Sequence, residues 1–267
     1  MPRENDHFWK GEESAYVSWE KMDKGRRGAS FSGDADKKRI LNLFFIVDVS
    51  GSMEGSRIEQ VNRAMANVFD KLRQRNDLRC SIRVSVMTFS YTAKWLTAQP
   101  VPLDAYRFSR IEAEPWYTCY SKAFLALEEK LHSNAFMDPR AGRYFAPLIL
   151  FISDGEPEDA EHYPSALNAL KQNRWFRSAS KYAVAVGEES RDQAVIQTLA
   201  QFTGMIENVR YADGGDAIAR LVEQIALQAS KMQVDDFTSG QGDFTGTKSI
   251  FRKRDETLFD TMFDRKK

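Results

Sequence analysis

Short apolar runs alternate with segments of helical periodicity through the central part of this 267-residue chain. The runs at 40–47 (ILNLFFIV) and 147–152 (PLILFI) are almost continuously apolar, as in strands that are buried on both faces. Residues 81–89 alternate between apolar and polar, which predicts a half-exposed strand near a sheet edge. Together these patterns predict strands at residues 40–47, 81–89, 91–96, 147–152, 181–186 and 205–209.

Helices fill the intervals between these strands. Ser56 and Glu59 have the spacing of a capping box, S-x-x-E, which predicts the start of a helix. Apolar residues then recur at helical spacing from Ile58 to Leu72 and give this helix one apolar face. Further helices are predicted at residues 120–131, 164–175, 191–202 and 216–230.

The alternation of strands and helices predicts an α/β fold, a three-layer, doubly wound and mostly parallel sheet with helices on both faces. The segment at 91–96 follows the strand at 81–89 after a short turn, which predicts one antiparallel strand at the edge. We expect the domain to span residues 39–231, between a polar N-terminal arm at 1–38 and a flexible C-terminal tail at 232–267.

Charge and cysteine content exclude several classes of protein. The 38 basic residues balance 38 acidic residues, whereas a dedicated nucleic-acid-binding protein carries a basic excess. Hydrophobic residues make up 42%, too many for a disordered chain, and two cysteines exclude a disulfide framework or a cysteine-rich zinc module. The N-terminal segment lacks the apolar core of a signal peptide, and the apolar runs fall short of the ~20 residues of a spanning helix. We therefore expect a cytoplasmic protein.

Small side chains that carry oxygen gather where predicted strands end. Asp48, Ser50 and Ser52 follow the first buried strand directly. Asp154 follows the second buried strand, and Thr118 precedes the helix that is predicted from residue 120. Open parallel sheets place functional groups at the carboxyl ends of their strands. Two carboxylates with three hydroxyls suit a hard divalent cation such as Mg2+.

This D-x-S-x-S…T…D set resembles the metal-ion-dependent adhesion site of von Willebrand factor A (VWA) domains, and the resemblance covers about residues 41–230. It implies a Rossmann-like fold. The stretch DVSGSMEGSRIEQVN is most similar to the intracellular bacterial subgroup typified by the tellurium-resistance protein TerY. That subgroup is associated with stress and anti-phage gene clusters, alongside TerD-type proteins, phosphatases and kinases.

The resemblance also implies a role for each residue of the set. Asp48 would hold the metal mainly through water, and Asp154 would be a carboxylate beyond the direct ligands. The direct hydroxyl ligands would be Ser50, Ser52 and Thr118. The implied cofactor is Mg2+, with Mn2+ as the alternative.

One position departs from the family pattern. Many relatives carry glycine before the threonine, whereas this chain has Trp116 and Tyr117. We assign Thr118 as the ligand because it precedes the predicted helix, and Ser121 is the alternative. We expect Trp116, Tyr117 and Glu156 to line a partner-binding rim around the metal.

Motifs for catalysis are missing from the sequence. It has no G-x-S-x-G nucleophile elbow, no phosphate-binding G-x-x-x-x-G-K-[ST] loop and no H-E-x-x-H. The sequence therefore favours a non-catalytic module that captures an Asp or Glu of a partner protein through the metal. TerD-type proteins, a phosphatase or a kinase of the same gene cluster are the candidate partners. The alternatives are a metal-dependent hydrolase of phosphate esters and a scaffold that binds through its tails.

Overall fold

The structure is a computed structural model that describes residues 38–75, 80–187 and 192–212 together with Arg220 and Gln224. These residues belong to one compact unit that begins at Lys38. The predicted N-terminal arm, apart from residue 38, and the whole C-terminal tail lie outside the described residues. The predicted helix at 216–230 also lies outside them, apart from Arg220 and Gln224. Within the described part, no helix is both long and apolar enough to cross a membrane.

A seven-stranded sheet forms the centre of the domain, and it is mostly parallel, as the sequence predicts. Its strands are β1 (Ile40–Asp48), β2 (Ser81–Phe89), β3 (Ala93–Trp95), β4 (Val101–Pro102), β5 (Leu148–Ser153), β6 (Ser180–Val186) and β7 (Val209–Ala212). The sequence predicted six of these strands and missed β4. The order is β3-β2-β1-β5-β6-β7, and β4 also pairs with β2. The predicted antiparallel edge position is shared by two short strands, since β3 and β4 both pair antiparallel with β2.

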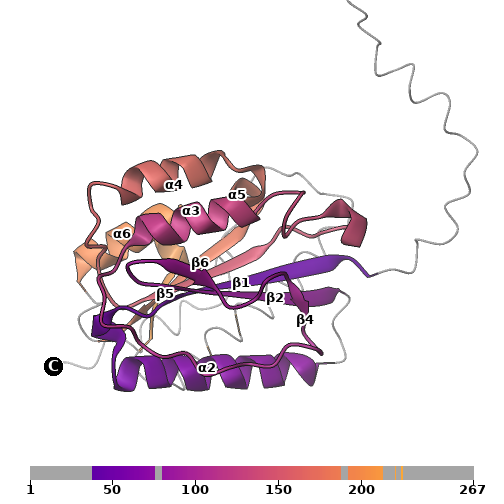
Figure 1. Cartoon of the computed structure of the whole chain (residues 1–267), viewed down its shortest axis with the longest axis horizontal. Coiled ribbons are helices and arrows are strands. Elements are labelled where there is room, and N and C mark those ends of the chain that lie inside the picture. Colours follow the sequence, from indigo (N-terminus) through magenta and orange to yellow (C-terminus); the bar gives the residue numbers. More distant parts are fainter. Residues whose placement is uncertain (1–37, 76–79, 188–191, 213–219, 221–223, 225–267) are drawn as a thin grey trace, which may run out of the picture. The chain divides into compact units, whose positions relative to one another are not determined.

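Helices cover both faces of this sheet (Figure 1). They are α2 (Ser56–Arg73), α3 (Tyr120–Lys130), α4 (Tyr163–Gln172), α5 (Arg174–Ser178) and α6 (Gln193–Thr203). Short 3-10 turns are η1 (Gly51–Met53), η2 (Pro139–Ala141) and η4 (Ile206–Asn208). Helix α2 lies on one face, and α3, α4 and α6 lie on the other. The three-layer α/β arrangement is confirmed.

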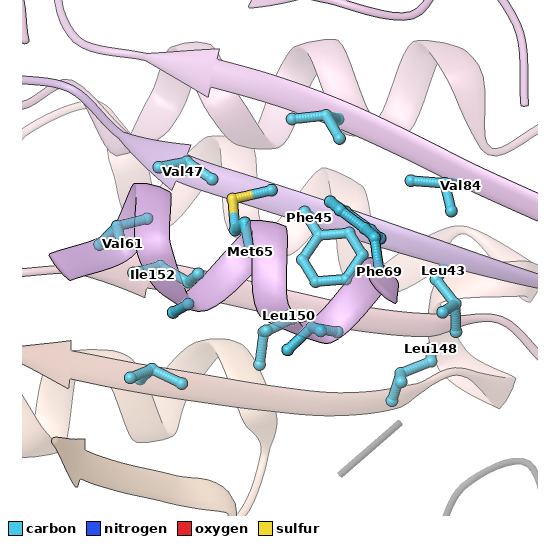
Figure 2. Packing of buried hydrophobic residues seen from close by; sticks show 14 of the residues in the cluster. Leu43, Phe45, Val47, Val61, Met65, Phe69, Val84, Leu148, Leu150 and Ile152 are labelled. Atoms are coloured by element: carbon cyan, nitrogen blue, oxygen red, sulfur yellow. The ribbon is translucent and has the colours of Figure 1, made fainter. Parts of the chain in front are cut away.

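Alternate residues of β1 feed two separate hydrophobic cores. Phe45 and its neighbours on one face pack against the apolar side of α2, where Met65 and Phe69 lie directly over the sheet (Figure 2). The rings of Phe45 and Phe69 meet edge to face at 5.1 Å. Phe44 and Ile46 point to the other face and join the core under α3, α4 and α6. This burial on both faces explains why the β1 sequence is almost continuously apolar.

The direction in which successive strands are added to the sheet reverses at β1. After β1 it forms β2 on one side of β1, and it later returns to form β5 on the other side. The carboxyl ends of β1 and β5 therefore meet at a topological switch point, where open α/β sheets bind ligands. The register pairs Val47 with Ile152, so Asp48 and Ser153 come next to each other at this edge.

Two local predictions about α2 and β2 are wrong. Gly55, not Ser56, caps α2, and no side-chain hydrogen bond forms there. Gly55 has a φ of 80°, which lets the chain turn into the helix before Ser56. Strand β2 is not half exposed, because Ser85 and Met87 are fully buried. Its two faces contribute to the two cores, so alternation of residue type did not mean alternation of exposure.

Two predicted elements later in the chain also differ. The helix expected at 164–175 is two helices, because Asn173 interrupts it. The Asn173 side chain accepts hydrogen bonds from the backbone of Trp175 and Phe176 and so caps α5. The last strand begins at Val209 rather than at residue 205, since the preceding residues form η4.

Aromatic packing around Phe151 provides a test of this core. Phe151 is fully buried, and its ring centroid lies 4.9 Å from Tyr120 and 5.0 Å from both Phe89 and Phe202. We predict that Phe151→Ala lowers the free energy of unfolding by about 3–5 kcal/mol, because it removes these contacts and leaves a cavity. Urea unfolding followed by far-UV circular dichroism measures the change.

The matched control is Leu125→Ala on α3, since the Leu125 side chain is half exposed. We expect this variant to change the free energy of unfolding by less than about 0.5 kcal/mol. An equally small loss for Phe151→Ala would contradict the packing described above.

Candidate metal centre

Asp48 ends β1 and lies at the centre of the candidate site. Its side chain is fully buried. One carboxylate oxygen accepts a hydrogen bond of 2.9 Å from the backbone N–H of Ser50, and the other accepts one of 2.6 Å from the Ser153 hydroxyl. Both donors follow from the fold, because Ser50 begins the turn after β1 and Ser153 ends the adjacent strand β5. The carboxylate is therefore fixed in orientation.

The Tyr120 hydroxyl is linked to the Asp48 carboxylate by hydrogen bonds through Ser153. The Tyr120 hydroxyl lies 2.9 Å from Ser153 Oγ and 2.8 Å from the carbonyl oxygen of Gly155. Burial raises the pKa of Tyr120 well above its usual value, so this phenol stays a neutral donor. The chain of contacts ties the first turn of α3 to the ends of β5 and β1.

Burial dominates the electrostatics of Asp48. It raises the pKa of Asp48 to about 7, although the hydrogen bonds from Ser153 and Ser50 act in the opposite direction. In the described part of the chain, no basic side chain forms an ion pair with this carboxylate. A buried anion without a counter-ion is electrostatically costly, and a bound cation would relieve that cost.

Ser50, Ser52 and Asp154 form a second hydrogen-bonded chain at the same edge. Ser50 Oγ lies 3.2 Å from Ser52 Oγ, and the Ser52 hydroxyl donates to Asp154 Oδ1 at 2.9 Å. Ser50 and Asp154 are buried, whereas Ser52 is exposed, so the site opens to solvent beside Ser52. The structure thus brings four of the five predicted site residues together, since Ser50 also bonds to Asp48.

Arg57, from the first turn of α2, completes this chain. Its Nη1 donates to Asp154 Oδ2 at 2.7 Å and to the backbone carbonyl of Ser52 at 2.8 Å. The Asp154 carboxylate is therefore held by Ser52 on one oxygen and by the guanidinium on the other.

The loop before α3 carries Thr118 to the same edge. The Gly51 N–H donates to the carbonyl oxygen of Trp116 at 3.0 Å, and the Cys119 N–H donates to that of Ser90 at 3.0 Å. These bonds fix the loop to the turn after β1 and to the end of β2. Thr118 is buried, and among the described residues its hydroxyl forms no hydrogen bond with the other four site residues.

Ser121 lies in the first turn of α3. Its backbone N–H and that of Tyr120 donate to the two carboxylate oxygens of Asp159, which caps this helix. Thr118 and Ser121 are both buried. The structure does not choose between them, so the assignment of Thr118 stays a prediction.

Exposed aromatic side chains come from the loops around the site. Trp116 is 57% exposed and Tyr117 is 63% exposed, although both are large and partly apolar. Tyr91, in the turn after β2, is 56% exposed, and Glu156, in the loop after β5, is also exposed. Side chains of this type and exposure are common at protein-binding surfaces.

The donor set suits a hard cation that binds oxygen. Within the described residues, no three His, Cys, Asp or Glu side chains gather as metal ligands, so a cation here depends on hydroxyl oxygens. The buried Asp48 carboxylate and the adjacent hydroxyls of Ser50 and Ser52 are oxygen donors of the kind that Mg2+ prefers, and Mg2+ commonly binds only one or two carboxylates together with water. The residues present therefore fit a divalent cation.

Sequence reasoning missed three residues that shape this site. Ser153 directly precedes Asp154, and the register of parallel strands would have placed it beside Asp48. Tyr120 carries no sequence signal beyond its place at the start of α3. Arg57 reaches Asp154 across 97 residues of sequence, and only the tertiary structure reveals that contact.

Comparison with known proteins places this arrangement in a family. The sequence profile of the von Willebrand factor type A domain matches residues 42–224. Human inter-alpha-trypsin inhibitor heavy chain H6 is 28% identical over 198 residues, which are 70% of this chain and 14% of that protein. The chain thus spans a small part of its curated relative.

Solved structures share the fold at low sequence identity. A von Willebrand factor type A protein from Catenulispora acidiphila has a TM-score of 0.53 at 14% identity, over 73% of this chain and 43% of that one. The pilus adhesin SpaC from Lactobacillus rhamnosus GG has a TM-score of 0.56 at 11% identity, over 75% of this chain and 32% of that one. Because the family profile covers more than half of the 267 residues, the chain belongs to the von Willebrand factor type A domain family.

Proposed function

We propose that this chain is a metal-dependent protein-interaction module, in which Mg2+ captures an Asp or Glu of a partner protein. Domains of this family often mediate protein interactions and commonly bind a divalent metal. The observation that carries the proposal is the buried Asp48 carboxylate, which lies at the switch point beside two serine hydroxyls and has no basic partner among the described residues.

Each residue of the site has a role in this proposal. Ser50, Ser52 and Thr118 would contact Mg2+ directly through their hydroxyls, and Asp48 would act mainly through water. Asp154 would act through Ser52, because its carboxylate already accepts the Ser52 hydrogen bond and orients a lone pair of that hydroxyl away from itself. Mn2+, which also prefers oxygen ligands, is the alternative ion.

The bound ion supplies an electrophilic position for an incoming carboxylate. With hydroxyls as the main ligands, little of its charge is neutralised, so a carboxylate from outside is attracted strongly. A partner must also pass over the rim, where Trp116 and Tyr117 offer apolar area and Glu156 repels a second negative charge. The rim would therefore select the partner, while the metal supplies the common anchor.

A non-catalytic role fits the chemistry of the site better than hydrolysis. Asp48 is fully buried and already engaged by two hydrogen bonds, so it is badly placed to take a proton from a substrate. The TerY-like placement, the cytoplasmic location and a stress-response or defence assembly with TerD-type proteins, a phosphatase or a kinase belong to the proposal. They rest on the motif resemblance.

The metal site is tested with Asp48→Asn. This change removes the carboxylate charge and keeps the side-chain shape, so we predict that stabilisation by Mg2+ is lost. For the wild type, Mg2+ at 100 times its Kd should raise Tm by about 5–10 °C relative to EDTA. Thermal unfolding in the two buffers measures the difference.

The matched control is Asp104→Asn. Asp104 is exposed and follows β4, which pairs near the start of β2. It therefore lies near the amino ends of the parallel strands, whereas the site lies at their carboxyl ends. Its Mg2+-dependent shift should equal that of the wild type. An unchanged shift in Asp48→Asn, or no shift in the wild type, would show that the ion does not bind at this site.

The interaction is tested by affinity capture from a lysate of the native host, with the captured proteins identified by mass spectrometry. We predict a partner that wild-type protein retains in Mg2+ and loses in EDTA, and that Asp154→Ala does not retain in Mg2+. The double variant Trp116→Ala/Tyr117→Ala should lose at least about 90% of this partner without a change in Tm, because both side chains are exposed.

Ile206→Ala is the control for the aromatic rim. Ile206 is 56% exposed, but it lies in η4, which directly precedes the start of β7. It therefore lies at the amino ends of the parallel strands, away from the proposed metal site. This variant should retain the partner fully. A partner that all variants hold equally in Mg2+ and in EDTA would move binding to another surface and refute the proposed mechanism.

A further inference from the structure

Arg57 bridges three elements beside the proposed metal site, at the carboxyl ends of β1 and β5. It projects from the first turn of α2, and its Nη1 bonds to the Ser52 carbonyl in η1 and to Asp154 after β5. The Asp154 side chain is almost completely buried, and that of Arg57 is 23% exposed. The ion pair is therefore shielded from solvent far more than an ordinary surface pair.

The backbone at the end of β6 leaves room for this side chain. Gly187 has a φ of 91°, and a Cβ atom there would lie 2.6 Å from Arg57 Nε. Any other residue at this position would displace the guanidinium. The glycine at the end of a third parallel strand thus leaves the space that the Arg57 guanidinium occupies.

The ion pair between Arg57 and Asp154 lowers the net negative charge at the proposed cation site. Asp48 and Asp154 bring two negative charges to the site, and Arg57 neutralises the one on Asp154. The guanidinium also contacts the backbone of Ser52, whose hydroxyl is a proposed metal ligand. It therefore places a permanent positive charge beside the position of the ion, and like charges repel.

We propose that Arg57 is a built-in counter-ion that positions Asp154 and weakens the binding of a divalent cation. This inference rests on the proposed metal site and adds a mechanism of regulation to it. The site by itself offers the ion only one carboxylate without a counter-ion. A carboxylate from the partner therefore makes the binding free energy of the ion much more favourable. Metal binding and partner binding are thereby coupled, and each raises the affinity for the other.

The test is Arg57→Gln, with Mn2+ as the probe and its binding measured by electron paramagnetic resonance of the free ion. We expect the Kd for Mn2+ to fall about tenfold relative to the wild type, equivalent to about 1.4 kcal/mol. In EDTA, the same variant should melt about 2–4 °C lower, because the bridge to Asp154 is lost. A purely structural role for Arg57 would lower Tm without tightening Mn2+ binding.

Three further variants separate charge from other effects. Arg63→Gln removes the same charge from an exposed position on α2, and its Kd should stay within about twofold of the wild type. Arg57→Lys keeps the charge and should stay within about threefold. Arg57→Met repeats the neutralisation with an apolar stem and should tighten Mn2+ binding as Arg57→Gln does.

The outcomes distinguish this inference from the function on which it rests. Tighter binding in both neutral Arg57 variants, with Arg57→Lys and Arg63→Gln near the wild type, supports it. Equal or weaker binding in those neutral variants, while the wild type binds Mn2+ and Asp48→Asn does not, overturns the inference and leaves the metal site standing. If neither the wild type nor Arg57→Gln binds millimolar Mn2+, both proposals fail.

Discussion

A buried carboxylate at the end of a buried strand is the constraint on which the site depends. Asp48 is removed from water because both faces of β1 are covered, by α2 on one side and by α3 on the other. The fold provides two hydrogen bonds to its oxygens, which orient the carboxylate and leave its charge uncompensated. A buried negative charge without a counter-ion is unfavourable, and either a proton or the proposed cation would relieve its cost.

The sheet topology explains why the other groups converge there. The reversal between β2 and β5 brings the ends of β1 and β5 together, and the loop before α3 is tied to the same edge by backbone hydrogen bonds. Helix α2 starts at this edge as well, which is how Arg57 comes to face Asp154. Segments that are 97 residues apart in sequence thus share one small volume.

The two carboxylates of the site differ in their environments, which is the basis for the different roles proposed for them. Asp48 is held by neutral donors and stays without a counter-ion among the described residues. Asp154 is paired with a guanidinium and accepts a hydrogen bond from Ser52. A site with one free negative charge would bind a divalent ion only moderately, so a partner carboxylate would complete both the coordination and the charge balance.

Local sequence patterns were enough to predict the fold class and four of the residues that gather at the candidate site, whereas the charge balance and the element boundaries depend on tertiary contacts. Apolar runs such as β1 and β5 are read directly, because burial on both faces requires apolar residues at every position. Asp48, Ser50, Ser52 and Asp154 are found for the same reason, since they directly follow those runs. The burial of β2 could not be read in this way, because its polar residues fit under helices that come from elsewhere in the chain. The pairing of Arg57 with Asp154 was equally hidden, because an ion pair depends on distances in space that no local pattern encodes.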